Sequence, residues 1–192
     1  MCNDTIISQI MVRENWPAYS NRANDAGGPT KGGITLRTLA AWRGRSVTVA
    51  ELQSLETSEA RRIYEQEFIK KPGFDAIEDV KLRAIVVDAA VMSGAALPIK
   101  WLQEELGLKQ DGILGPVTRL AIASVSPRAL GLLFSARRAI FYSWLVQERP
   151  TDIANIEGWE RRTMEFVSTT AREMINEQMS IHLGQRANGG KA

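Results

Sequence analysis

Apolar residues recur along this chain with the spacing of amphipathic helices. The first such stretch is expected to be capped by Asp4 and to end at Glu14, because Pro17 cannot continue a helix. Its inward face is formed by Ile6, Ile7, Ile10 and Met11. The pattern therefore predicts a short N-terminal helix that brings a carboxylate to the start of an irregular, glycine-rich segment.

Further helices are predicted over most of the chain, bounded by capping residues, glycine or proline, as in the capping box Thr48-Val-Ala-Glu51. The expected ranges are 35–42, a short helix after 48, 57–71, 76–93, 97–106, a helix from 116, 127–148 and 158–183. Trp101 and Trp144 fit the apolar periodicity and are expected in the core. Strand-like alternation is almost absent, so we predict an all-α protein of eight or nine helices with at most a small β-hairpin within residues 18–35.

The character of the sequence changes after Gly94. We expect one domain over residues 1–94, a second helical domain over 95–183 and a flexible tail over 184–192. The connection from Gly94 to Pro98 is short. The two halves are therefore either independent modules or parts of one packed body, and the sequence leaves both open.

The composition is that of a soluble globular protein, with 44% hydrophobic and 24% charged residues. The net charge of +2 gives no reason to expect nucleic acid as a partner. Residues 1–50 nevertheless carry six cationic side chains against three anionic ones. Such a surplus suits an anionic polymer, or it is an ordinary solvated face.

Single copies of cysteine and histidine exclude several kinds of chemistry. Cys2 has no partner for an intramolecular disulfide, and His182 lies far from the candidate site in the sequence. A zinc site with several His ligands and a Ser-His-Asp triad are therefore not expected, and we predict no metal and no cofactor. We also read no secretory signal, no membrane span or anchor, and expect a monomer.

The segment from Glu14 to Thr35 carries the candidate chemistry. Cleavage of a glycosidic bond needs a proton donor and a group on the opposite side of the sugar ring, and Glu14 followed by Asp25 and Thr30 provides such a set. The donor must stay protonated, which requires a raised carboxyl pKa. The plainer alternatives are an exposed helix-end Glu14, a turn residue at Asp25 and a loop hydrogen bond at Thr30.

The order of these motifs resembles glycoside hydrolase family 108, the phage-type N-acetylmuramidases of the lysozyme-like superfamily. The resemblance is carried by Glu14, Tyr19 and Asp25-Ala-Gly-Gly-Pro-Thr30-Lys-Gly-Gly-Ile-Thr35, then by the segments around Trp42 and Tyr64 and by Asp88-Ala-Ala-Val-Met-Ser-Gly94. The chain departs from the family pattern at residues 15–18, where Asn, Trp, Pro and Ala replace glycines, and at Met92, where Asn is usual.

The second half resembles a predicted peptidoglycan-binding domain that often follows this catalytic domain. The matching pieces are Trp101-Leu-Gln-Glu-Glu-Leu-Gly107, Asp111-Gly-Ile-Leu-Gly-Pro-Val-Thr118, Phe141-Tyr142 and Gly158-Trp159-Glu-Arg-Arg162. The two resemblances together cover roughly residues 5–180.

The resemblance implies that Glu14 acts as general acid, with Asp25 and Thr30 handling water or the developing positive charge. Substrate contacts are expected from Tyr19, Thr35, Trp42, Asp88 and Trp159. Aromatic faces bind sugar rings, although Trp42 and Trp159 are equally explained by packing.

The implied function is that of an endolysin that cleaves the MurNAc–GlcNAc β-1,4 bond of peptidoglycan glycan strands. A phage enzyme of this kind would accumulate in the host cytoplasm, depend on a holin to reach the wall, act in the periplasm and cause host lysis. Two alternatives stay open. One is a lytic transglycosylase, which needs no second carboxylate, and the other is a non-catalytic wall-binding or virion protein.

Overall fold

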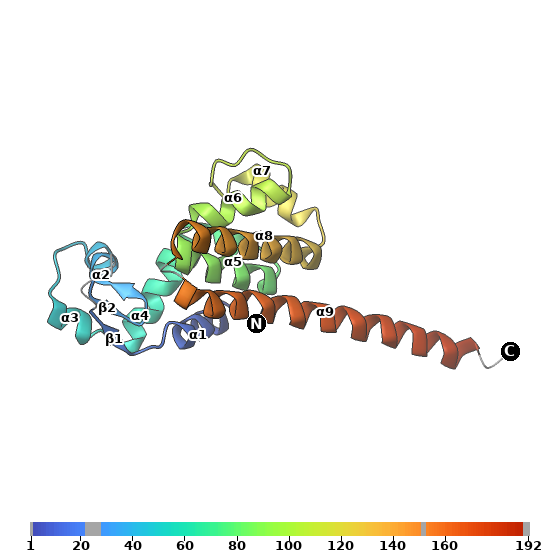
Figure 1. The fold of residues 1–192 in the computed structure, drawn as a ribbon, viewed down its shortest axis with the longest axis horizontal. Coiled ribbons are helices and arrows are strands. Elements are labelled where there is room, and N and C mark those ends of the chain that lie inside the picture. Colours follow the sequence, from blue (N-terminus) through green and yellow to red (C-terminus); the bar gives the residue numbers. More distant parts are fainter. Residues whose placement is uncertain (1, 22–27, 151–152, 190–192) are drawn as a thin grey trace.

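The computed structural model describes residues 2–21, 28–150 and 153–189. Its N-terminal part begins with helix α1 (Asn3–Arg13), followed by a small antiparallel sheet of strands β1 (Tyr19–Ser20), β2 (Thr30–Lys31) and β3 (Ile34–Thr35) in the order β1-β2-β3. Helices α2 (Leu36–Arg43), α3 (Val49–Gln53) and α4 (Thr57–Ile63) complete a lobe at one end of the molecule (Figure 1). The small hairpin expected within residues 18–35 is confirmed as part of this sheet.

Local capping chemistry explains where these helices begin. The Thr48 hydroxyl accepts from the Glu51 N–H while the Glu51 carboxylate accepts from the Thr48 N–H, so the predicted capping box is confirmed. The prediction that Asp4 caps α1 is wrong: the helix starts two residues earlier, with Cys2 at its N-cap. The Asp4 carboxylate pairs with Arg61 instead, across to α4.

A long apolar helix forms the centre of the molecule. Helix α4 continues through a π-helical segment, η1 (Tyr64–Lys70), and a 3-10 turn, η2 (Phe74–Ala76), into α5 (Val80–Ser93). Seven consecutive or near-consecutive positions of α5 are buried, namely Leu82, Ile85, Val86, Val87, Asp88, Ala89 and Ala90. Burial on nearly all sides explains the apolar composition of this segment.

The C-terminal half packs onto α5. Helices α6 (Ala96–Glu105) and α8 (Pro127–Glu148) both contact it, with α7 (Pro116–Ala123) between them in the chain. One hydrophobic cluster runs without interruption from Ile6 to Phe134. Residues from both halves of the sequence therefore contribute to one core, and the division into two domains at residue 94 stays a prediction.

Two tryptophans of this half lie in different environments. Trp101 is buried against Phe134 and Phe141, as predicted. The prediction for Trp144 is wrong, since its side chain is 49% exposed. Two residues along a helix correspond to a rotation of about 200°, so Trp144 faces away from the side that buries Tyr142.

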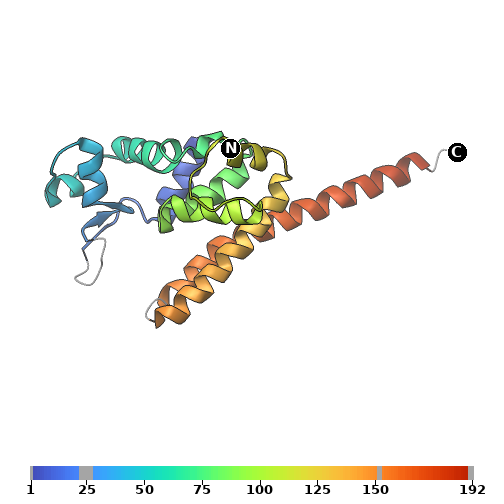
Figure 2. The ribbon, with the colours of Figure 1, turned by 90° about the horizontal axis from the view of Figure 1, so that it is seen from above.

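The last helix is longer than predicted. Helix α9 spans Ile153–Gly189, packs on α8 over its first part and then projects beyond the rest of the molecule (Figures 1 and 2). It thus starts before the expected residue 158 and continues into the segment expected to be a flexible tail. Among the described residues, α8 is the one helix long and apolar enough to cross a membrane. Its buried face, which includes Leu130 and Phe134, is that of a core helix, and the absence of a membrane anchor stays a prediction.

Candidate active site

Glu14 stands where helix α1 ends. Its backbone N–H donates to the Ile10 carbonyl oxygen at 2.8 Å, and the chain then turns through Asn15, whose φ of +56° lies in the left-handed region. The Glu14 side chain is 22% exposed. A partly covered carboxyl group is thus presented to the segment that follows, as the sequence predicted.

The turn between β2 and β3 packs directly against this carboxyl group. Gly33 has a φ of +76°, and a Cβ atom there would lie 3.0 Å from Glu14 Oε2 and 2.7 Å from the Tyr64 hydroxyl oxygen. The Tyr64 hydroxyl donates to the Gly32 carbonyl oxygen at 2.5 Å. Burial raises the pKa of Tyr64, and the charge of Glu14 raises it further. Tyr64 is therefore a neutral donor that fixes the glycine turn beside Glu14.

Trp16 covers the other side of the same turn. A Cβ atom at Gly32 would lie 2.5 Å from the Trp16 ring, so the backbone and the ring are in close contact. The indole N–H donates to the Thr57 hydroxyl at 3.2 Å, and the Lys31 ammonium lies 5.3 Å from the ring centroid. Tyr19 lies on the adjacent strand, paired with Lys31. The sheet therefore brings Trp16 and Tyr19 to the region of Glu14.

The remaining members of the predicted catalytic segment have local structural roles or cannot be placed. The Thr30 hydroxyl donates to the Gly28 carbonyl oxygen at 2.9 Å, which is the plainer alternative considered for it. The Thr35 hydroxyl accepts from the Thr38 N–H at 3.1 Å and caps α2. Asp25 lies outside the described residues. The contacts of all three with substrate stay predictions.

An arginine that sequence reasoning missed reaches Glu14 from the far end of the chain. Arg162 Nη1 of α9 lies 3.2 Å from Glu14 Oε1, and Arg162 Nη2 donates to the Arg13 carbonyl oxygen at 3.1 Å. Arg162 belongs to the Gly158-Trp159-Glu-Arg-Arg162 motif that was noted in the sequence. Its contact with Glu14 could not be predicted, because 148 positions separate the two residues.

Asp88 lies beneath this site in a buried ionic cluster. Its Oδ1 accepts from Arg13 at 3.0 Å and its Oδ2 accepts from Arg138 at 2.7 Å, and Asp88 is only 4% exposed. Burial alone would raise the pKa of Asp88, but the charges of Arg138 and Arg13 hold it below its ordinary value. With both oxygens occupied by arginines, Asp88 joins α1 and α5 to α8, and its expected contact with substrate stays a prediction.

Both candidate sugar-binding tryptophans are partly buried. The ring of Trp159 stacks on Tyr142 with centroids 4.9 Å apart, and the Tyr142 hydroxyl accepts from Arg138 at 2.8 Å. Trp42, in the last turn of α2, packs against the hydrophobic core. Packing thus accounts for both, as the alternative interpretation proposed, without testing a role in binding.

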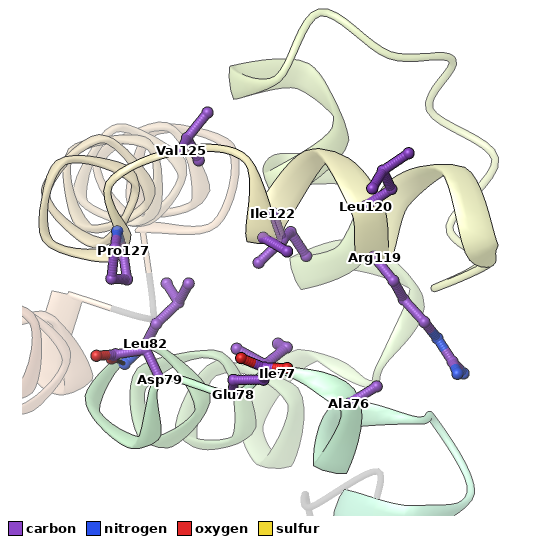
Figure 3. Close-up of a pocket in the computed structure, with 11 residues that line it drawn as sticks. Ala76, Ile77, Glu78, Asp79, Leu82, Arg119, Leu120, Ile122, Val125 and Pro127 are labelled. Carbon is purple, nitrogen blue, oxygen red and sulfur yellow. Dashed lines mark hydrogen bonds between the residues drawn. The ribbon is translucent and has the colours of Figure 1, made fainter.

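Two of the surface cavities do not include the Glu14 side chain. One of about 560 Å³ lies between α5 and the α7–α8 region, where Leu82 and Ile122 point into it and Arg119 lies at its edge (Figure 3). Another, of about 260 Å³, is lined by residues of the buried ionic cluster and by α9. Glu14 lines neither of them. Within the described ranges, no group of three or more His, Cys, Asp or Glu side chains is arranged to hold a metal ion.

Comparison with known families connects this geometry to a class of enzyme. Residues 7–94 match the model described as Glycosyl hydrolase 108, and residues 97–164 match the model described as Predicted Peptidoglycan domain. The N-terminal part of the chain is thus similar to glycosyl hydrolase family 108, and the peptidoglycan domain follows it in order. The order of the two matches, and the mostly α-helical lysozyme-like fold, confirm what the sequence motifs implied.

A solved structure is similar over most of the chain. The structure of SagA from Brucella abortus is similar to this chain with a TM-score of 0.72 and 28% sequence identity, over 89% of this chain and 96% of that one. The comparison with curated proteins gave no match. The two family matches together support a glycosidase that acts on peptidoglycan.

Proposed function

We propose that this enzyme hydrolyses the β-1,4 bond between MurNAc and GlcNAc, with Glu14 as general acid. The observation that carries the proposal is the placement of Glu14. Its carboxyl group is only 22% exposed, is bound on one oxygen by Arg162 and has its other oxygen beside the Gly33 backbone. A glycine turn allows a sugar chain to approach closely to such a group.

The chemical step follows from the two oxygens of Glu14. Within the described residues, Arg162 is the donor on Oε1, and no donor contacts Oε2. In the proposed step, Glu14 in its acid form transfers a proton from Oε2, the oxygen that Arg162 does not bind, to the glycosidic oxygen as the bond from that oxygen to the sugar C1 breaks. A water molecule then supplies the hydroxyl group at C1, and its remaining proton returns to a carboxylate.

Asp25 is the proposed second carboxylate, with Thr30 helping to hold the water. A separation of about 5 Å between the two carboxyl groups would give retention at C1, and about 6.5–9.5 Å would give inversion. This part of the proposal rests on the family resemblance and on the order of the motifs. The biological setting proposed is likewise that of a phage endolysin, a monomer that depends on a holin, passes from the host cytoplasm to the periplasm and lyses the cell.

Product analysis tests which bond is cut and how. Purified sacculi are digested, and the released muropeptides are identified by mass spectrometry. The proposal expects reducing MurNAc ends from the wild-type enzyme and none above background from Glu14→Gln. Reducing GlcNAc ends would contradict the bond assignment, and 1,6-anhydro-MurNAc ends would show a transglycosylase.

A further inference from the structure

We infer that Arg162 is a positioning residue for Glu14, and that the peptidoglycan-domain half thereby completes the active site of the catalytic half. This inference rests on the proposed role of Glu14. Its starting observation is that one guanidinium group makes two contacts at the end of α1. Nη1 binds Glu14 Oε1 at 3.2 Å, and Nη2 binds the Arg13 carbonyl oxygen at 3.1 Å.

Helix α9 is held in a register that delivers Arg162 to this place. Trp159 and Phe166 lie three residues before and four residues after Arg162, so all three share one face of the helix. The Trp159 ring stacks on Tyr142, and the Phe166 ring fits where Gly131 of α8 has no side chain, since a Cβ there would lie 2.8 Å from Phe166 Cζ. The contact between α8 and α9 therefore fixes the position of Arg162 along the axis of α9 relative to α8.

The surroundings of the guanidinium group hold it there. Its Nη1 also lies 3.5 Å from the Met92 sulfur. The Asp88 carboxylate lies close enough for the charge of Arg162 to contribute to its lowered pKa. The Arg162 side chain is 22% exposed. A planar guanidinium with two fixed acceptors is more strongly oriented than a single point charge would be.

The consequence for catalysis concerns which oxygen carries the proton. Arginine is only a donor, so Oε1 must accept and cannot hold a proton on the side of Arg162. In the acid form of Glu14 that the proposed function requires, the proton then lies on Oε2, which is on the side of the Gly33 turn. Without Arg162 the carboxyl group can rotate and place its proton on either oxygen. Misplacement of a reacting group by about 1 Å can cost about a hundredfold in rate.

The experiment compares Arg162→Gln and Arg162→Lys with a matched control in full-length protein. Glu165→Gln is the control, because Glu165 links the same two helices through Arg13 at 3.3 Å without touching Glu14. The measurements are kcat and KM on soluble glycan strands, co-sedimentation with sacculi, and thermal unfolding. We expect R162Q to lower kcat at least tenfold with KM and sacculus binding unchanged. R162K, which cannot make both contacts, should have an intermediate kcat, and E165Q should retain the wild-type kcat.

The outcomes separate this inference from the proposed function. If E14Q remains fully active, Glu14 is not the acid and both proposals fail. If E14Q is inactive while R162Q equals E165Q in kcat, only the positioning role is overturned. A change in KM alone would show that Arg162 contributes to binding rather than positioning and would also overturn it. Should R162Q fail to fold, R162K decides, because a wild-type kcat in that variant contradicts the two-point hold.

Discussion

The buried contact between Asp88 and its arginines gives a stability prediction with a defined magnitude. Asp88→Asn keeps the shape of the side chain but removes its charge, leaving Arg138, which is 2% exposed, without its carboxylate partner. Breaking a buried ion pair in this way costs about 3–5 kcal/mol. In a protein of this size each kcal/mol lowers Tm by about 2–4 °C, so we expect a fall of about 6–20 °C near neutral pH.

The pair of Asp88 and Arg138 also predicts how the difference in Tm between the wild type and Asp88→Asn depends on pH. The pKa of Asp88 in the folded protein lies below its ordinary value of 3.8. The charged form therefore stabilises the fold fully above about pH 3.8, and this contribution is lost as the pH falls through the folded-state pKa. Asp88→Asn lacks the contribution at every pH. The gap in Tm between the wild type and this variant should accordingly narrow on acidification.

Thermal unfolding followed by circular dichroism is the assay, with Asp75→Asn, at an exposed aspartate of η2, as the control. A double variant, Asp88→Asn with Arg138→Met, should recover part of the loss, because no unpaired charge then remains at Arg138. The reasoning is refuted if Asp88→Asn melts within about 2 °C of the control, a shift of less than about 1 kcal/mol. A gap that stays constant as the pH falls would refute the electrostatic part.

Three further substitutions test separate contacts. Gly33→Ala should reduce sacculus hydrolysis far more than the control Gly44→Ala. Both glycines have a positive φ, but only at Gly33 would the added methyl group meet Glu14 and Tyr64. Equal activities of the two variants would argue against the close turn. Gly131→Leu should cost about 1–3 kcal/mol in urea unfolding by pushing Phe166 off α8, and an unchanged midpoint would contradict that packing. Thr48→Ala should cost about 1 kcal/mol through loss of the capping box without affecting activity, measured by the same unfolding curves and lysis assay.

The spacing of apolar residues, together with capping residues, glycines and prolines, was sufficient to predict the helical fold and the position of Glu14. Pro17 ends α1, glycines mark the β2–β3 turn, and the capping box at Thr48 starts α3 where expected. These signals are local, since each depends on residues within one or two helical turns. The family resemblance added the order of the two domains, which the comparisons confirm.

Long-range pairing explains what could not be predicted. The sequence separation of Glu14 and Arg162 does not indicate that they are in contact. The sequence around Asp88 likewise does not indicate that its carboxylate pairs with two arginines. Trp144 was misplaced because a helix apolar on several sides does not show which side faces the core. Helix α9 extends past the predicted end at residue 183, into a polar segment whose sequence shows no apolar periodicity to mark a helix.

The central claim is that Glu14 supplies the proton, and one rate comparison tests it most directly. New reducing ends released from purified sacculi are measured for the wild type, for Glu14→Gln and for Glu56→Gln, a control at the exposed N-cap of α4 whose side chain makes no capping hydrogen bond. Loss of a general acid is expected to slow the reaction by about 10²–10⁴-fold, with Glu56→Gln at the wild-type rate. A Glu14→Gln enzyme that releases reducing ends as fast as Glu56→Gln would contradict the claim.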